Sequence, residues 1–135
     1  MAIEGLKEFQ NGLNKFIEEA KDISEEEVRK GALGITLRGL IYKTPVDNGT
    51  ARGNWNTSLN YKNTSHSNEV GINDGISKGQ QKLGRFKLGE TIYFTNSLPY
   101  IISLEFGSSK QAPNGMMRLT FQETINWFRK RKGKV

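Results

Sequence analysis

The sequence predicts an α+β domain in which a central antiparallel sheet is packed by N-terminal and C-terminal helices. Two observations support this class. Helical periodicity is confined to residues 3–42 and 99–130, whereas alternating polar and apolar residues, separated by turn residues, occupy the middle of the chain. A length of 135 residues suffices to bury one core, so residues 1–135 are expected to form a single domain.

Two helices are expected in the first third of the chain. Apolar residues at steps of three and four predict an amphipathic helix over about residues 3–21. A capping box predicts the start of a second helix, over about 25–42, with Ser24 accepting from the amide of Glu27 and Glu27 reaching back to Ser24. The predicted inward residues are Leu6, Phe9, Leu13, Phe16, Ile17 and Ala20 in the first helix, and Val28, Ala32, Ile35 and Leu40 in the second.

Three glycines lie inside the second predicted helix. Gly31, Gly34 and Gly39 each weaken a helix by up to about 1 kcal/mol relative to alanine. They indicate either a loosely wound helix of an ordinary kind or a surface that another backbone can approach closely.

The chain then turns into a strand. Pro45 ends the second helix because it disfavours helical geometry at Thr44, and Asp47-Asn48-Gly49 is typical of a turn. Alternation over residues 54–61 predicts a half-buried strand. Its predicted inward face comprises Trp55, Thr57, Leu59 and Tyr61.

The central region continues with turn-rich sequence. A short strand is expected at Glu69–Ile72 and another at Ile92–Thr95. Residues 73–91 are rich in glycine and lysine and predict a long loop, of a length typical of functional or mobile segments.

The C-terminal part predicts two more helices. Pro99 is suited to begin a short helix over Tyr100–Phe106, which Gly107 ends. The last helix is expected over about 115–130, followed by a basic, flexible tail over about 129–135. Its predicted apolar face comprises Met117, Phe121, Thr124, Ile125 and Phe128.

The positive charge is unevenly distributed. The net charge of +6 combines −3 over residues 1–30 with +9 over residues 31–135. The tail is either a solvated, frayed terminus or a segment that contacts phosphates or an acidic face of another protein. Its basic residues are Arg129, Lys130, Arg131, Lys132 and Lys134.

The sequence contains no recognisable catalytic constellation. The chain has no cysteine, and its one histidine, His66, lies in a polar turn, so neither a nucleophile–base pair nor a metal-ligand cluster is evident. The glycine- and lysine-rich segment lacks the Gly-Lys-Ser/Thr ending of a phosphate-binding loop. We therefore expect no enzymatic activity, no cofactor and no metal.

No apolar run at the N-terminus has the length of a signal peptide, and none elsewhere has the length of a membrane span. The sequence thus predicts a soluble protein that is not secreted. A pI near 9.6 and the basic residues of 73–91 and of the tail leave open a nucleic-acid-binding module with weak, salt-sensitive binding.

Two sequence blocks carry a resemblance. The first is TPVDNGTARGNW, with Thr44, Pro45, Val46, Asp47, Gly49 and Arg52; the second is TNSLPYIISLEFGSSKQAPNGMM, with Asn96, Pro99, Tyr100, Glu105, Phe106, Gly107, Pro113 and Met116 or Met117. Their order and spacing resemble those of a tailed-phage family of tail-completion or head–tail joining proteins related to the minor tail protein Z of lambda. The blocks cover roughly a quarter of the chain. Asn48, Ala51 and Ile101 depart from the usual Thr, Leu and small residue, which suggests local repacking.

The resemblance implies a non-enzymatic virion protein, made in the host cytoplasm and located in the neck or head-proximal tail. Such α+β subunits form a ring, commonly six-fold, that joins the tail to the head connector and lets DNA pass through its bore. The implied partners are other copies of the chain, connector and tail-tube or terminator proteins, and DNA. A tail terminator that caps the tail tube is the close alternative.

These expectations assign roles to named residues. The turn and interface candidates are Thr44, Pro45, Asp47, Gly49, Arg52, Trp55, Asn96, Pro99, Tyr100, Glu105 and Gly107; the subunit-contact candidates in the predicted loop are Lys78, Lys82, Arg85 and Lys87; the DNA-facing or acidic-partner candidates are the tail residues Arg129, Lys130, Arg131, Lys132 and Lys134.

Residues 44–55 have two interpretations: a corner that turns the helix into the strand, or a subunit contact through Arg52 or Trp55. Arg52 is expected to pair with Asp47 or Glu105. Glu105 is expected to partner an arginine or a helix amide rather than act as a catalytic acid.

Overall fold

The computed structural model describes residues 7–8, 10–12, 14–15, 23–45, 50–66, 72–106 and 115–132. Within them the fold is α+β, as predicted, with a two-stranded antiparallel sheet and helices before, between and after its strands. The elements are α2 (Glu25–Gly31), the π-helical η1 (Ala32–Leu37), α3 (Arg38–Lys43), α4 (Thr50–Gly53), β1 (Asn56–Leu59), α5 (Ile72–Leu83), β2 (Ile92–Thr95), α6 (Ile101–Glu105) and α7 (Met117–Lys132).

The first predicted helix falls mostly outside the described residues. Those described between 7 and 15 are helical and exposed. The predicted apolar stripe, Leu6, Phe9, Leu13, Phe16, Ile17 and Ala20, lies outside the described residues.

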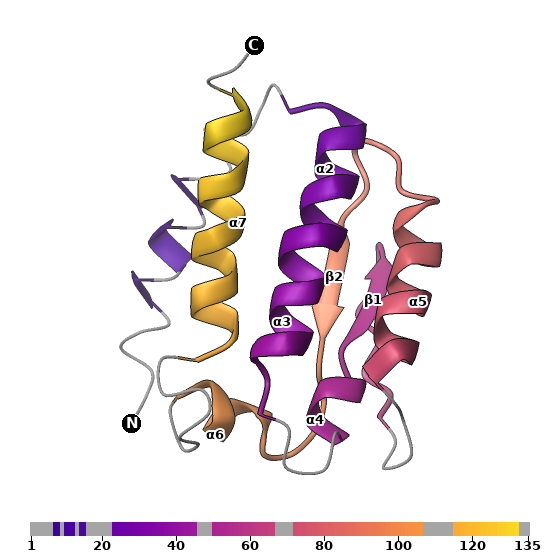
Figure 1. The fold of residues 1–135 in the computed structure, drawn as a ribbon, viewed down its shortest axis with the longest axis vertical. Helices are drawn as coiled ribbons and strands as arrows, with labels where there is room; N and C mark the ends of the chain where they lie inside the picture. Colours follow the sequence, from indigo (N-terminus) through magenta and orange to yellow (C-terminus); the bar gives the residue numbers. More distant parts are fainter. Residues whose placement is uncertain are drawn as a thin grey trace.

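The second predicted helix forms as one continuous rod, α2–η1–α3, at the centre of the domain (Figure 1). It begins where predicted, because the Ser24 hydroxyl accepts from the Glu27 amide at 3.2 Å. The reciprocal half of the capping box does not form, since the Glu27 carboxylate instead lies 3.7 Å from the guanidinium of Arg131. Of the predicted inward residues, Ala32 and Leu40 are buried, and Val28 and Ile35 are half-buried.

Two of the three glycines in the rod face α7. A Cβ at Gly31 would lie 2.5 Å from Phe128 Cζ, and one at Gly39 would lie 2.9 Å from Thr120 Cγ2. Gly34 has no such neighbour within 4 Å. The close-approach interpretation is therefore right for Gly31 and Gly39, and the approaching element is the helix α7 of the same chain.

The sheet pairs β1 with β2 in the register Asn56↔Thr95 to Leu59↔Ile92. Phe94 packs against a core made by Leu37, Leu40, Ile41, Trp55 and Met116. Polar residues 61–66 return across the opposite face, where Thr95 donates its hydroxyl proton to the Asn63 carbonyl and the Asn56 amide donates to the Ser65 carbonyl at 2.9 Å.

This covering segment explains where the predicted strand pattern is wrong. Trp55 and Thr57 are buried as predicted, but Ser58, on the other face, is fully buried and donates to the Tyr61 carbonyl at 2.5 Å. Tyr61 lies beyond the strand and is 54% exposed. Strand β2 matches its predicted range, Ile92–Thr95.

The predicted long loop over residues 73–91 is wrong for most of its length, because residues 72–83 form helix α5. The predicted strand at Glu69–Ile72 is wrong at Ile72, which begins this helix; its first three residues lie outside the described residues. α5 packs on β1 and on the central rod (Figure 1). Arg29 holds its C-terminal end, donating from Nε to the Leu83 carbonyl at 3.1 Å and from Nη2 to the Phe86 carbonyl at 2.5 Å.

A glycine makes this packing possible. A Cβ at Gly79 would overlap Leu37 Cδ2 and lie 3.0 Å from Thr57 Oγ1. Gly75, one turn earlier, faces Ile41 in the same way. Glycine thus occupies the inward face of α5, where apolar periodicity would otherwise have marked a helix.

Gly79→Ala is expected to lower the free energy of unfolding by about 1–3 kcal/mol, because the added methyl group overpacks the buried Leu37. The matched control is Gly34→Ala, also inside a helix but with no contact within 4 Å, which should raise stability by up to about 1 kcal/mol. Urea denaturation followed by circular dichroism measures both. A Gly79→Ala protein as stable as Gly34→Ala would contradict the placement of α5.

The C-terminal elements match the predicted helices with one correction. α6 begins after Tyr100, within one residue of its predicted start. The tail does not begin at residue 129, because α7 runs to Lys132 and Arg131 stacks 4.6 Å from the Trp127 ring centroid while pairing with Glu27. On the predicted apolar face, Thr124, Ile125 and Phe128 are buried, and Met117 and Phe121 are half-buried.

Candidate functional site

The first sequence block forms a polar joint between α3 and β1. Thr44 is fully buried; its hydroxyl donates to the Leu40 carbonyl and accepts from the Trp55 indole N–H at 2.8 Å. Arg52, on α4, donates from Nε to the Thr44 carbonyl at 2.6 Å and from Nη2 to the Tyr42 carbonyl at 2.9 Å. Arg52 therefore satisfies carbonyls at the end of α3, where a positive charge also complements the helix dipole.

The expected pairing of Arg52 with Glu105 is wrong. Glu105 is the last residue of α6, and its carboxylate pairs with Arg118 in the first turn of α7. The alternative partner, Asp47, lies outside the described residues, as do Gly49 and Gly107. Within the described part of the block, the corner interpretation accounts for Thr44, Arg52 and Trp55 through contacts inside the chain.

The second block closes the joint from the other side. The Asn96 side-chain amide donates to the Ala51 carbonyl at 2.9 Å, and its carbonyl oxygen accepts from the Leu98 amide at 3.2 Å. Asn96 thus ties the end of β2 to α4, so the two blocks, separated in sequence by β1 and α5, meet in space. Pro45 is buried beside the joint, whereas Pro99 is exposed in the turn before α6.

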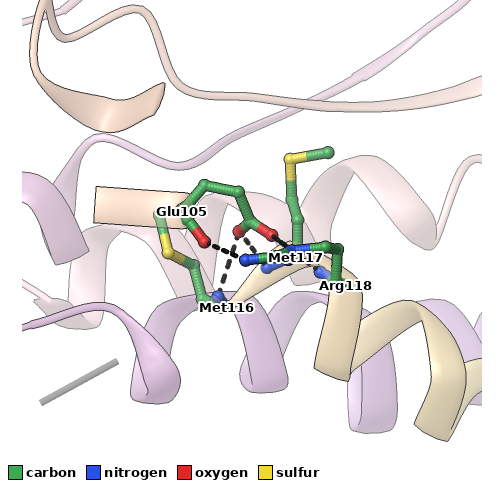
Figure 2. A network of polar contacts seen from close by, with 4 residues as sticks. All are labelled: Glu105, Met116, Met117 and Arg118. Carbon is green, nitrogen blue, oxygen red and sulfur yellow. Dashed lines mark hydrogen bonds and ion pairs between the residues drawn. The ribbon is translucent and has the colours of Figure 1, made fainter. Parts of the chain in front are cut away.

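Glu105 caps α7 from outside that helix (Figure 2). It is 6% exposed and accepts from the backbone amides of Met116 at 3.0 Å, Met117 at 2.6 Å and Arg118 at 3.1 Å. Arg118 also donates from Nε to the carboxylate at 3.0 Å and from Nη2 to the Glu105 backbone carbonyl at 2.7 Å. The expectation that Glu105 partners an arginine or a helix amide is confirmed, since it does both.

Gly115 makes room for this cap. Its φ of +83° lies in the left-handed region that favours glycine, and a Cβ there would overlap the Glu105 carboxylate. The carboxylate is consequently enclosed by backbone, and a negative charge at the start of α7 complements the helix dipole.

Apolar side chains are exposed at the end of the domain where the joint lies. Tyr42 is 50% exposed near the end of α3, Tyr100 42% and Ile102 70% at α6, and Leu119 43% in the first turn of α7. The end of α3, α6 and the start of α7 lie together at the lower end of the domain in Figure 1. We call these four residues the apolar end surface.

The two other large apolar side chains exposed in the described residues, Tyr61 and Leu88, lie after β1 and between α5 and β2. The α5–β2 connection is at the opposite end of the domain from the apolar end surface (Figure 1). The C-terminal end of α7, with exposed Arg129, Lys130 and Arg131, also lies there, and Lys134 is outside the described residues. The apolar end surface and these basic residues thus lie at opposite ends of the domain.

The lysines of α5 belong to a pocket of about 210 Å³. Of the four residues predicted as loop contacts, Lys78 and Lys82 line this pocket, whereas Arg85 and Lys87 follow the helix and are exposed. His66, which has no catalytic or metal-binding partner near it in the sequence, also lines this pocket. The spacing of Lys78 and Lys82, one helical turn apart, would have indicated a common face only if α5 had been recognised.

The described residues include no group of three or more His, Asp or Glu side chains arranged to hold a metal ion. Nor does any helix in the described part of the chain have the length and apolar character required to cross a bilayer. Comparisons with protein-family models, with curated proteins and with solved structures find no match to this chain.

Proposed function

We propose that this protein is a structural subunit of a tailed bacteriophage, acting in tail completion as a homo-oligomeric ring that joins the tail to the head connector and lets DNA pass. The observation that supports the proposal is the joint itself. The two sequence blocks that resemble the tail-completion family meet through Asn96 and Ala51. The second block contributes Tyr100 and Ile102 to the apolar end surface, and the helices that flank the blocks contribute Tyr42 and Leu119.

Exposed side chains of this kind favour association. Burying an isoleucine or tyrosine side chain that is now exposed contributes about 1.5–3 kcal/mol, so four of them can supply the core of a contact between copies. The polar groups beneath them are already satisfied within the chain, because Arg52 and Asn96 bond backbone carbonyls. The joint can therefore present the surface without leaving its own hydrogen bonds unmade.

The proposal predicts that Ile102→Asp abolishes self-association. The wild-type protein is expected to sediment as a homo-oligomer, and a carboxylate buried in the contact should weaken association by about 100-fold or more. The matched control is Leu88→Asp, which changes an equally exposed side chain at the opposite end and should leave the oligomer intact. Sedimentation velocity and light scattering measure the mass of each variant.

A wild-type protein that is monomeric at all accessible concentrations would contradict the proposal, as would equal loss of association in both variants.

Imaging of phage particles assembled without the protein tests the role itself. Heads and complete tails found unjoined are expected for a tail-completion subunit, whereas tails of irregular length would favour the terminator that caps the tail tube. Normal joined particles would exclude both.

A small basic nucleic-acid-binding protein is the second candidate. It is supported by the three exposed basic residues at the end of α7, Arg129, Lys130 and Arg131. That function predicts salt-sensitive DNA binding by a monomer, which the same sedimentation experiment distinguishes from a ring subunit.

A further inference from the structure

The pocket beside α5 is built from three separate parts of the chain. β1 and the residues before it supply one wall, the segment over residues 63–66 supplies a second, and one face of α5 supplies the third. Its lining comprises Gly53, Asn54, Trp55, Asn56, Thr57, Asn63, Ser65, His66, Gly75, Lys78, Gln81 and Lys82. None of these described residues is acidic.

The acceptors around the pocket are largely used within the protein. The Asn63 carbonyl accepts from Thr95, and the Ser65 carbonyl accepts from Asn56. The side-chain oxygen of Asn63 accepts from both the amide and the hydroxyl of Ser65. The side-chain amides of Asn54 and Asn56 also donate within the chain, so the donors that the lining offers a ligand are mainly the ammonium groups of Lys78 and Lys82.

Positive charge is concentrated on the helical wall. Lys78 and Lys82 are one turn apart on α5, and neither ammonium group forms an ion pair with a described residue. Like charges at this spacing repel one another, so an anion held between them would stabilise the helix as well as bind.

From these observations we propose that the pocket binds a phosphate group. A phosphate presents several strong acceptors and a negative charge, which matches a lining that carries the ammonium groups of Lys78 and Lys82 and no acidic side chain among its described residues. The volume of about 210 Å³ also leaves room for the group to which a phosphate is esterified. The source is either a free phosphate or nucleotide, or the backbone of a nucleic acid. The inference does not depend on the proposed function.

The test is a titration of the full-length protein with inorganic phosphate, and separately with a short DNA duplex, at constant ionic strength. Backbone amide chemical shifts report the binding site. Saturable shifts at Thr57, Asn63, His66, Lys78 and Lys82 are expected with at least one of the two probes. If phosphate competes with the duplex, the source is a nucleic-acid backbone; if phosphate alone binds at the pocket, the source is a small molecule.

The key variant is Lys78→Gln with Lys82→Gln, which should weaken binding about tenfold or more, because two charged donors are lost. The matched control is Arg85→Gln with Lys87→Gln. It removes the same charge from exposed positions just beyond α5 and should change affinity by less than about threefold. No saturable shift with either probe would overturn the proposal. Equal weakening in both double variants would also overturn it, by showing that net charge rather than the pocket is responsible.

Discussion

Glu105→Ala is expected to lower the free energy of unfolding by about 2–3 kcal/mol, because it removes a buried carboxylate that accepts several hydrogen bonds. The substitution leaves three backbone amides at the start of α7 and the Arg118 guanidinium without their acceptor. These amides cannot bond within α7, since the first N–H groups of a helix have no intrahelical partner. Urea denaturation monitored by circular dichroism measures the loss.

Glu123→Ala is the matched control for this prediction. Glu123 also pairs with a cation, Lys43, at 2.9 Å, but its side chain is 54% exposed, so its removal should cost less than about 1 kcal/mol. The loss of stability in Glu105→Gln should lie between those of Glu105→Ala and Glu123→Ala, because glutamine keeps one acceptor oxygen and the shape but loses the charge. Equal stabilities for Glu105→Ala and Glu123→Ala would show that Glu105 does not hold α7.

Trp55→Ala is expected to cost about 3–5 kcal/mol, since it opens a cavity at a side chain that is 4% exposed in the main core. Trp55→Phe should cost about 1 kcal/mol from the indole hydrogen bond to Thr44, plus a smaller packing loss. Thermal and urea unfolding of both variants separates the loss of the indole hydrogen bond from the loss of packing in the core.

Trp127→Phe provides the comparison, because Trp127 is only half-buried; its ring contacts Phe128 and Arg131 and lies against Gly31. Trp127→Phe should lower the free energy of unfolding less than either Trp55→Ala or Trp55→Phe. The Trp55 variants also decide between the two interpretations of residues 44–55. If Trp55→Ala left stability unchanged but prevented self-association, Trp55 would be a subunit contact and not part of the corner.

Local signals were sufficient where an element depends on neighbours in sequence. Ser24 and Glu27 marked the start of the central rod, the alternation at Ile92–Thr95 marked β2, and Pro99 marked α6, and each agrees with the structure. The expectation that Glu105 partners an arginine or a helix amide also agrees with the structure, although the amides that it accepts from lie 11 to 13 residues further along the chain.

Helix α5 could not be predicted in this way because its reasons for being helical lie elsewhere in the chain. Gly75 and Gly79 lower its intrinsic propensity, yet they are what allows it to lie against Leu37, Ile41 and β1. Arg29 then satisfies carbonyls at its end. Tertiary packing outweighed local preference here.

The sequence by itself determined the α+β class, the central rod, β2, α6 and the inward residues of α7, because periodicity and capping are local. Only the tertiary structure decided that Arg52 bonds the carbonyls of Tyr42 and Thr44, that Arg131 pairs with Glu27, and that a pocket joins His66 to Lys78 and Lys82. Each of these contacts joins segments that a one-dimensional pattern does not relate. Their partners are fixed by how the helices pack on the sheet and on one another.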